Sequence, residues 1–559
     1  MRRGKKLLVT LLALSLTAGI LGGCGSNGGN IGGEDEGGAG QASSASKAVQ
    51  ESQEGSAVSK AEENKEIVVA IDSDIGDISP FGVSGGGRNY VRFMLYDCIA
   101  QASAPGQSID EMDWALAKNI TKIDDLTYEI EIYDYIYDTA GNHMTASDVA
   151  FSLNKAVELG TSSKFSSNFD HCTVTGDYTV ELGITTPKLG IIEYMCSQIP
   201  VVVQTSYEAQ SENERATKPV TTGPYKISEL VSGSYLVMEK NEKYWQTDDS
   251  MKSYQAAQNV DKVTLQVTTE NSQRAIALET KSATVATSVA VSDIGQFIND
   301  DGSARDGYNV KSVLSGTTTV LEFNCDEGAV FDNKELRQAV LYAIDSEAVM
   351  QAALSGNGMI TNDFSSQAAS DYDKGWNDED YYGYDEEKAK EMMKEAGYPD
   401  GGLKIKIMTW EDTAMKTACQ VVQAYLLQIG ISSEIVVYDN ALFNTNMYDS
   451  KQWDILINGY GCTDYVVDTW SLRFDRTGFS NNKTGQFIAD DKLQELLLAA
   501  CNIETHSMET VDAFHEYVRD NAYACGLYTP YKYVVALDSV EELVTHPWGQ
   551  VIAGACRYK

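Results

Sequence analysis

The fold class follows from residues 403–438, which read LKIKIMTWEDTAMKTACQVVQAYLLQIGISSEIVVY. The first part, residues 403–409, alternates apolar and polar side chains, as a strand with one buried face does. Residues 414–429 repeat at helical spacing up to Gly430, and residues 431–438 indicate a second strand. A strand, a helix and a strand of these lengths form a βαβ unit, whose two strands pair in parallel. The sequence therefore predicts an α/β protein.

Segments before this unit carry similar signals. Residues 66–71 form a short apolar run typical of a buried strand, and residues 128–133 alternate as a strand does. The Tyr133–Tyr137 run also alternates and is most simply one face of a strand. Thr145 and Asp148 are placed to cap a helix with one apolar face.

Three more helix ends can be predicted from a capping residue and a glycine stop. Asp332, with Glu335 three residues on, is expected to cap a helix with a buried stripe. A further helix is expected to begin after Asp385 and to end at the glycine stop of Ala396-Gly397, with proline just beyond.

The N-terminus has the layout of a secretory signal peptide. Residues 1–6 carry four positive charges and lead into an apolar run from Leu7 to Leu21. This run is too short for a transmembrane helix, which needs about 20 apolar residues. Leu21-Gly22-Gly23-Cys24 then resembles the lipobox of bacterial lipoproteins, in which the peptide is cut before an acylated cysteine. The resemblance implies lipidation at Cys24; the alternative is a secreted protein in which Cys24 is incidental.

A linker is expected to follow the signal peptide. Residues 25–65 are rich in Gly, Ser, Glu, Ala and Gln, a composition that cannot bury a core. A flexible chain of this length has a root-mean-square reach of about 35 Å. We therefore expect a signal peptide at 1–23 and a lipidated linker at 24–65, which holds a folded body at the outer face of the cell membrane.

Composition limits the classes of partner. The 559-residue chain has a formal charge of −38, and loss of the four signal-peptide cations, Arg2, Arg3, Lys5 and Lys6, takes it to −42. Such an acidic surface repels nucleic acid and anionic lipid, so we expect no nucleic acid as a partner. The roughly 495 residues after the linker are long enough for two or three lobes.

The cysteines and histidines predict no cofactor. Besides Cys24, nine cysteines are dispersed without a C-x-x-C pair, at positions 98, 172, 196, 325, 419, 462, 501, 525 and 556. This pattern is neither a zinc motif nor a compact disulfide framework, and it indicates mostly buried thiols, with one or two disulfides left open. The five histidines lack metal-ligand spacing on a predicted helix, so we expect no metal site.

Four groups of motifs succeed one another along the body of the chain. They lie at residues 141–152, at 222–226 with 241–245, at 323–324 with 336–345, and at 389–398 with 429–431. In this order they resemble the extracytoplasmic solute-binding proteins that serve dipeptide and oligopeptide ABC importers. The motifs consist mostly of caps, glycine stops and core helices, so they identify the fold better than the ligand.

The resemblance implies a periplasmic-binding-protein-like α/β fold, with two α/β lobes joined by a hinge and an extra domain inserted in the first lobe. Lobe I would comprise residues 66–101, 202–318 and 527–559, the inserted domain II residues 102–201, and lobe III residues 319–526. The chain would cross between the lobes near 319 and near 527. The implied partners are an ABC permease in the membrane and a small solute, and we expect a monomer.

One stretch of the predicted lobe III carries most of the candidate ligand-binding residues. In peptide-binding members of the family an aspartate pairs with the peptide's α-ammonium group, in a motif resembling Gly-Trp-x-x-Asp-Tyr-x-Asp-Pro. The matching residues 459–468 make Asp464 the first candidate, because one buried carboxylate both neutralises and orients an ammonium. The alternative is a solvated loop residue or a helix cap. The other candidates in the stretch are Tyr460, Cys462, Tyr465 and Asp468.

This stretch departs from the family pattern. Tyr460 stands where the family usually has Trp, one residue is inserted before Asp464, and the final Pro is absent. These changes put an ordinary peptide ligand in doubt.

Two other groups are candidates. Gly85, Gly86 and Gly87 lie in a loop where the family's peptide binders pair backbone to backbone with the ligand, although glycines also suit any tight loop. Trp410 and Trp453, together with Trp470, could line an aromatic cleft, with the hydrophobic core as the alternative.

The predicted function is a membrane-tethered receptor that captures short peptides between two lobes and delivers them to the permease. A non-peptide solute such as an oligosaccharide is the alternative on the same fold. An exported hydrolase would need a nucleophile with its base, and no cysteine has a plausible histidine partner nearby in the sequence, so we expect no enzyme. A sensing role is compatible with the first interpretation.

Overall fold

The computed structural model describes residues 65–82, 86–299, 301–361, 364–378, 381–461, 464–477, 488–546 and 549–559. The chain divides into a unit of residues 1–62 and a unit of residues 63–559, and all of the described residues belong to the second unit. The predicted signal peptide and linker, with Cys24, lie outside the described residues, as do Gly85 and Cys462. None of the helices in the described ranges is both long and apolar enough to cross a membrane.

Twelve strands form one large sheet. Its order is β16-β15-β17-β13-β18-β11-β1-β10-β9-β8, and β12 and β14 also pair with β18. The strands are β1 (Glu66–Ile71), β8 (Tyr225–Val231), β9 (Tyr235–Lys240), β10 (Lys262–Val267), β11 (Val285–Ala286), β12 (Tyr308–Leu314), β13 (Thr317–Phe323), β14 (Gly358–Ile360), β15 (Leu403–Trp410), β16 (Ile431–Tyr438), β17 (Ile455–Gly461) and β18 (Ala524–Leu537).

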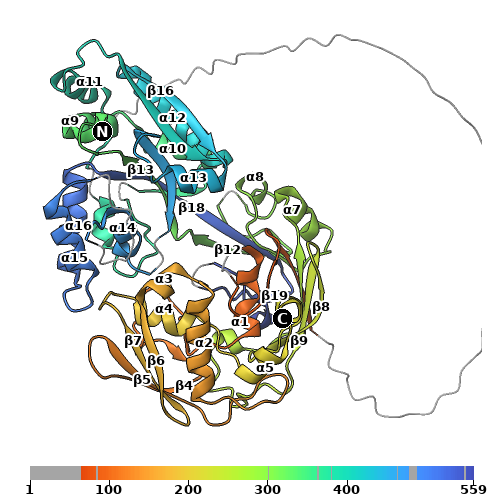
Figure 1. Ribbon diagram of the computed structural model, residues 1–559. Coiled ribbons are helices and arrows are strands. Elements are labelled where there is room, and N and C mark those ends of the chain that lie inside the picture. Colours follow the sequence, from red (N-terminus) through yellow and green to blue (C-terminus); the bar gives the residue numbers. More distant parts are fainter. Residues whose placement is uncertain are drawn as a thin grey trace, which may run out of the picture. The chain divides into compact units, whose positions relative to one another are not determined.

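Helices and shorter elements complete the fold (Figure 1). The α-helices are α1 (Arg92–Leu95), α2 (Ala146–Glu158), α3 (Ser163–Asn168), α4 (Ile191–Gln198), α5 (Gln204–Ala209), α6 (Glu212–Thr217), α7 (Asn271–Glu279), α8 (Val291–Ile294), α9 (Lys334–Tyr342), α10 (Ser346–Leu354), α11 (Glu386–Glu395), α12 (Thr413–Gln428), α13 (Asn440–Asn446), α14 (Val466–Phe474), α15 (Asp491–Cys501) and α16 (Met508–Asp520). Short 3-10 helices lie at Gly86–Tyr90, Tyr254–Ala256, Val330–Asp332, Lys374–Asp378 and Ala553–Ala555, and two-stranded sheets are formed by β2 (Ala100–Gln101) with β3 (Asp113–Trp114) and by β19 (Val540–Glu542) with β20 (Arg557–Tyr558).

The predicted βαβ unit is confirmed. Strands β15 and β16 pair in parallel, from Leu403 opposite Ile431 to Trp410 opposite Tyr438, and α12 connects them. Helix α12 turns Ala418, Val422 and Leu426 into the core, which is the face that the helical spacing of the sequence predicts.

Strand β18 joins the two halves of the large sheet (Figure 1). One half contains β13, β15, β16 and β17, and the other contains β1 and β8 to β11, with β12 also paired to β18. Residues 524–528 pair with β13, and residues 531–537 pair with β12. Since β12 and β13 are consecutive in the chain, the backbone passes between the two halves at two neighbouring places, residues 314–317 and residues 528–531.

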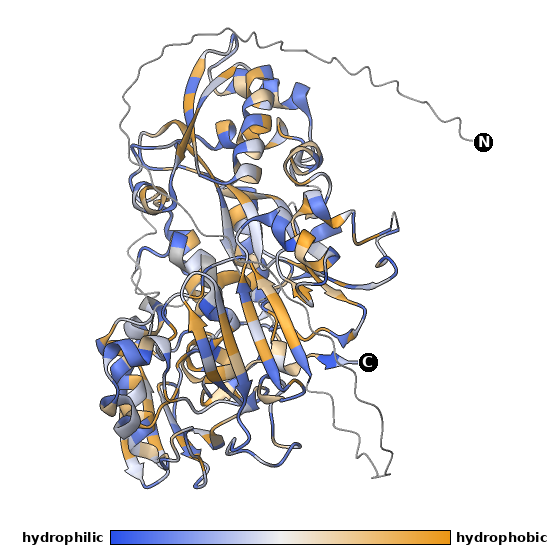
Figure 2. Cartoon of the chain, turned by 90° about the vertical axis from the view of Figure 1, so that its right-hand side faces the viewer, coloured by the Kyte–Doolittle hydropathy of each residue, from blue (hydrophilic) through white to orange (hydrophobic). Residues whose placement is uncertain are grey.

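A second, four-stranded sheet lies within residues 102–201, which we call the small-sheet region. Its order is β4-β5-β7-β6, formed by β4 (Ala117–Lys122), β5 (Thr127–Ile132), β6 (Phe169–Gly176) and β7 (Thr179–Ile184). Its buried residues belong to the same hydrophobic core as those of β1, β8, β9 and β10. A separate core, which we call the C-terminal core, spans Val320 to Tyr528. Figure 2 shows the alternating orange and blue bands of elements that bury one face.

One of the two predicted caps is confirmed, since Thr145 and Asp148 form a capping box at the start of α2. The helix predicted after Asp385 is α11, and the Asp385 side chain caps it by accepting from Lys388 N. The predicted cap at Asp332 is wrong. Residues 330–332 form their own 3-10 turn, so the helix begins one residue later, where Asn333 Oδ1 accepts from Leu336 N at 3.0 Å.

The predicted strand at Tyr133–Tyr137 is also wrong. Strand β5 ends at Ile132, residues 134 and 135 form a turn, and Tyr137 takes part only in an isolated bridge with His143. The alternation instead reflects aromatic packing, because the rings of Tyr133 and Tyr135 lie 6.1 and 5.9 Å from that of Trp245.

The paired motifs at residues 222–226 and 241–245 meet around the buried carboxyl group of Asp97. The Tyr244 hydroxyl donates to it at 3.1 Å and Trp245 Nε1 at 2.7 Å, while Asp97 N donates to Thr222 Oγ1 at 3.0 Å. A Cβ atom on Gly223 would lie 2.6 Å from Met94 O, so only glycine fits there. These motifs are therefore structural.

The carboxyl group of Asp97 is expected to make stability depend on pH. Burial raises its pKa to about 7, although its two hydrogen-bond donors act in the opposite direction. The folded state then holds a proton that the unfolded state loses above about pH 4, so stability falls as pH rises from 4 to 7, by at most ~4 kcal/mol. The substitution Asp97→Asn should remove this part of the pH dependence.

Urea unfolding of wild type and of the Asp97→Asn variant at pH 4, 5.5, 7 and 8.5 measures the effect. The free energy of unfolding of the variant, minus that of wild type, should increase as pH rises from 4 to 7 and level off above pH 7. Parallel pH profiles for the two proteins would contradict a raised pKa at this position.

Candidate functional site

A cavity lies where the small-sheet region meets the C-terminal core. Its empty volume is about 430 Å³, a figure that includes open solvent at its mouth. Helix α4 forms one wall, and the loop before β3 and the start of α14 form the others. The lining residues are Ala102, Ala104, Gly106, Gln107, Met112, Gly190, Glu193, Tyr194, Ser197, Gln198, Asp464, Tyr465 and His546.

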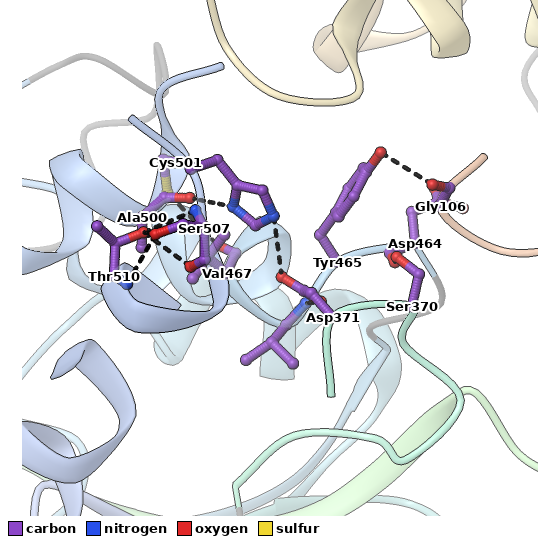
Figure 3. A network of polar contacts seen from close by, with 12 residues as sticks. Gly106, Ser370, Asp371, Asp464, Tyr465, Val467, Ala500, Cys501, Ser507 and Thr510 are labelled. Carbon is purple, nitrogen blue, oxygen red and sulfur yellow. Dashed lines mark hydrogen bonds and ion pairs between the residues drawn. The ribbon is translucent and has the colours of Figure 1, made fainter. Parts of the chain in front are cut away.

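Asp464, the first candidate from the sequence, lines this cavity, and its backbone is held by a neighbouring loop (Figure 3). Ser370 donates to Asp464 O twice, from N at 2.9 Å and from Oγ at 2.7 Å. The N-cap position of α14 is Tyr465, and Val466 N donates to Asp371 Oδ1 at 2.6 Å. Asp371 thus takes the capping role at this helix terminus.

Tyr465 also lines the cavity and joins the two regions directly. Its hydroxyl donates to Gly106 O at 3.0 Å (Figure 3). Its ring meets the His506 ring edge-on at 5.7 Å. Burial raises the pKa of this phenol, so it stays protonated and remains a donor at neutral pH.

Two glycines of the small-sheet region make this close approach possible. Both have a left-handed backbone, with φ of 62° at Gly106 and 74° at Gly190. A Cβ atom on Gly106 would overlap Ser370 Oγ and lie 2.7 Å from Asp464 O, and one on Gly190 would lie 3.0 Å from the Tyr465 ring.

Backbone contacts join the same two regions beside the cavity. Leu189 N donates to Cys501 O at 3.0 Å, and Ile503 N donates to Pro187 O at 2.9 Å. Between them the buried Lys188 Nζ donates to Ser471 Oγ at 3.0 Å. The structure therefore holds the small-sheet region against the C-terminal core by direct hydrogen bonds.

Glu193 on α4 brings a second carboxylate to the cavity. Its Oε1 accepts from Ile109 N at 3.1 Å, whereas its Oε2 is buried and has no hydrogen-bond partner among the described residues. Burial raises its pKa, the charge of Asp464 raises it further, and Lys164 lowers it. Sequence reasoning missed Glu193, since an acidic residue on a helix gives no signal of which cavity it lines.

His546 contributes a neutral ring to the same cavity. Burial, helped by the charge of Arg92, lowers the pKa of His546 to about 3, so the imidazole is uncharged at neutral pH. Within the described part of the chain, the lining residues include no lysine and no arginine, and they include the two carboxyl groups of Glu193 and Asp464. The cavity is therefore suited to a cationic group.

The remaining candidates from the sequence lie elsewhere or in undescribed parts. The Tyr460 hydroxyl donates to Glu322 Oε2 at 2.6 Å, and its ring is buried in the C-terminal core. Trp453 and Trp470 are buried in that core, and Trp410 packs against it. Asp468 lies on α14, and nothing is described of its side chain.

The two described glycines of the predicted ligand loop have a visible structural role. Gly87 N donates to Asp74 O at 2.9 Å, and a Cβ atom on Gly87 would lie 2.7 Å from both Ser73 O and Asp74 O. Gly86 has φ of 54°. Neither glycine is among the residues that line the cavity.

The described cysteines agree with the prediction of mostly buried thiols. Seven of these eight residues are buried, and Cys525 is half-buried. In the same ranges of the chain, no group of three or more His, Cys, Asp or Glu is arranged to hold a metal ion.

Comparison with known proteins places this architecture in a family. The model of the bacterial extracellular solute-binding proteins, family 5 (Middle), matches residues 111–482. The chain therefore belongs to this family, and the resemblance drawn from its motifs is confirmed.

Two relatives are similar to this chain at low sequence identity. The glutathione-binding protein GsiB of Pectobacterium atrosepticum is 23% identical over 386 residues, covering 67% of this chain and 70% of that protein. The probable peptide ABC transporter periplasmic-binding protein y4tO of Sinorhizobium fredii is 25% identical over 384 residues, covering 65% of this chain and 69% of that protein.

Solved structures share the fold. A putative peptide-binding protein AppA from Clostridium difficile aligns with a TM-score of 0.73 at 17% identity, over 88% of this chain and all of that one. The substrate-binding protein CtaP from Listeria monocytogenes aligns with a TM-score of 0.73 at 18% identity, over 89% of this chain and all of that one. The α/β fold predicted from the sequence is confirmed.

Proposed function

We propose that this solute-binding protein is the receptor of an ABC importer and captures short peptides, with Asp464 binding the α-ammonium group. The observation that carries the proposal is the placement of Asp464. Its backbone is held by Ser370, and it lines a cavity built by two regions of the chain. Family membership and relatives named for glutathione and peptide binding support the ligand class.

The proposed lobes keep the division made from the sequence. Lobe I comprises residues 66–101, 202–318 and 527–559, domain II residues 102–201, and lobe III residues 319–526. The hinge would lie where the backbone passes between the halves of the large sheet, at 314–317 and 528–531. A peptide that touches domain II and lobe III at once stabilises the closed arrangement, so binding shifts the hinge equilibrium without any reaction.

A peptide library tests the proposal against an oligosaccharide ligand. Short peptides should raise the melting temperature of the mature protein, by an amount that grows with the free concentration of ligand, and oligosaccharides should not. Asp464→Ala should weaken peptide binding about 10- to 100-fold, as expected for the loss of a charged hydrogen bond. Binding of oligosaccharides alone, or an unchanged affinity in the variant, would contradict the proposal.

We also propose that Cys24 carries a lipid and tethers the receptor near its permease, which raises the local concentration of loaded receptor. The support is the sequence Leu21-Gly22-Gly23-Cys24 after a short apolar run. Cys24→Ala should move the protein from the membrane fraction into the medium and leave its peptide affinity unchanged. Fractionation and immunoblotting measure this, with Cys98→Ala as a matched control. Membrane retention of the Cys24→Ala variant would contradict lipidation.

A further inference from the structure

Arg92 differs from four other buried arginines in how little compensates its charge. Arg88, Arg274 and Arg337 each donate to two or more backbone carbonyls, and Arg473 forms an ion pair with the buried Glu322. Arg92 is only 6% exposed, yet within the described ranges its guanidinium donates to a single acceptor, Gln198 Oε1, and forms no ion pair. An uncompensated buried charge is destabilising, so its retention needs a reason.

The surroundings of Arg92 connect it to the cavity. Its one described acceptor, Gln198, lines the cavity at the C-terminal end of α4. The guanidinium carbon lies 4.5 Å from the ring centroid of Phe93, which in turn stacks on the neutral ring of His546, another lining residue, at 4.5 Å. The positive charge therefore stands directly behind this end of the cavity.

The opposite end of α4 carries a carboxyl group. Glu193 lies five residues before Gln198, and an α-helix rises 1.5 Å per residue, which separates the two positions by about 7.5 Å along the helix. Glu193 lines the same cavity as Asp464, and one of its carboxylate oxygens has no described partner. The carboxyl groups of Glu193 and Asp464 are therefore the acidic groups of the cavity. The side-chain amide of Gln198, with Arg92 behind it, lies at the C-terminal end of α4.

We propose that this charge arrangement selects a dipeptide-sized zwitterion, whose ammonium group lies between Glu193 and Asp464 and whose carboxylate accepts from the side-chain amide of Gln198, with the positive charge of Arg92 behind it. The inference rests on the proposed peptide-binding function and names the ligand length and the additional residues. An extended residue spans at most about 3.3–3.6 Å, so two residues match about 7 Å and four residues greatly exceed it.

Blocked and unblocked peptides test each end separately. The probes are random dipeptide and tetrapeptide libraries with free termini, and the dipeptide library after N-acetylation or C-amidation, measured by native mass spectrometry and thermal shift. Wild type should bind free dipeptides at least about 10-fold more tightly than tetrapeptides and than either blocked dipeptide library.

The variants identify the residues. Arg92→Gln should bind free and C-amidated dipeptides equally, while keeping the preference for a free amino group. Glu193→Gln should lose affinity for the free amine about 10-fold and keep the preference for a free carboxylate. Arg88→Gln is the matched control, because it removes a nearby buried arginine that has its own carbonyl acceptors, and it should keep both preferences.

A second readout separates binding from a structural role of Arg92. If its charge is uncompensated in the ligand-free protein, Arg92→Gln should melt at the same or a higher temperature than wild type. A lower melting temperature with both preferences intact would overturn the assignment. Wild-type binding of tetrapeptides as tight as that of dipeptides would overturn the length selection alone, and absence of any peptide binding would overturn the proposed function as well.

Discussion

The substitution Gly106→Ala is expected to weaken peptide binding about 10- to 100-fold while leaving the small-sheet region and the C-terminal core folded. Its Cβ atom would overlap Ser370 Oγ and lie 2.7 Å from Asp464 O, so the small-sheet region could no longer approach the C-terminal core as closely. Insertion of an atom into such a contact costs about 1–3 kcal/mol. Because Asp464 and α4 must meet the same ligand, this cost appears in the affinity.

Gly141→Ala provides the matched control. Gly141 also has a left-handed backbone, with φ of 86°, but a Cβ atom there meets nothing within 4 Å. Both variants therefore carry the backbone strain of alanine in this conformation, and only Gly106→Ala blocks the contact. Isothermal titration calorimetry with one library peptide that wild type binds measures the affinity of each variant. Equal affinities for the two variants would show that the contact at Gly106 does not support binding.

Replacing Glu322 by Gln is expected to lower the free energy of unfolding by about 3–5 kcal/mol, because it leaves a buried arginine without its carboxylate. Glu322 and Arg473 are 1% and 4% exposed. Arg473 Nη2 donates to Glu322 Oε1 at 2.7 Å and Nε to Oε2 at 3.2 Å, and the Tyr460 hydroxyl completes the group at 2.6 Å from Oε2.

The double variant Glu322→Gln with Arg473→Met serves as the control for this prediction. It removes both charges, so it should recover much of the stability lost in Glu322→Gln alone. Urea denaturation of all three proteins measures the free energies. A single variant that is as stable as wild type would show that the ion pair does not compensate the charge of Arg473.

Much of the fold could be predicted because it depends on local patterns. The βαβ unit at residues 403–438 follows from periodicity and a glycine stop, and the capping box at Thr145 follows from two side chains three residues apart. Where two capping residues adjoin, as at Asp332 and Asn333, the sequence does not say which one begins the helix. That choice depends on the preceding turn.

The site was less predictable because it is built from distant segments. Asp464 and Tyr465 came from the family motif, and the structure places both at the cavity. Tyr460, from the same motif, donates instead to Glu322 on the paired strand β13, four residues beyond Thr318, which is opposite Tyr460 in the sheet. Glu193, Gln198 and Arg92 belong to no motif. The first two lie on α4, and the contact of Arg92 on α1 with Gln198 is made between segments far apart in the sequence.

Hydrogen exchange with and without a bound peptide tests most directly the claim that the solute is held between the small-sheet region and the C-terminal core. The amides of α4, at Ile191–Gln198, and those of residues 464–467 should both exchange more slowly in the complex, while those of α11, whose residues do not line the cavity, should not change. Protection confined to one of the two regions, or found in neither, would contradict binding between them.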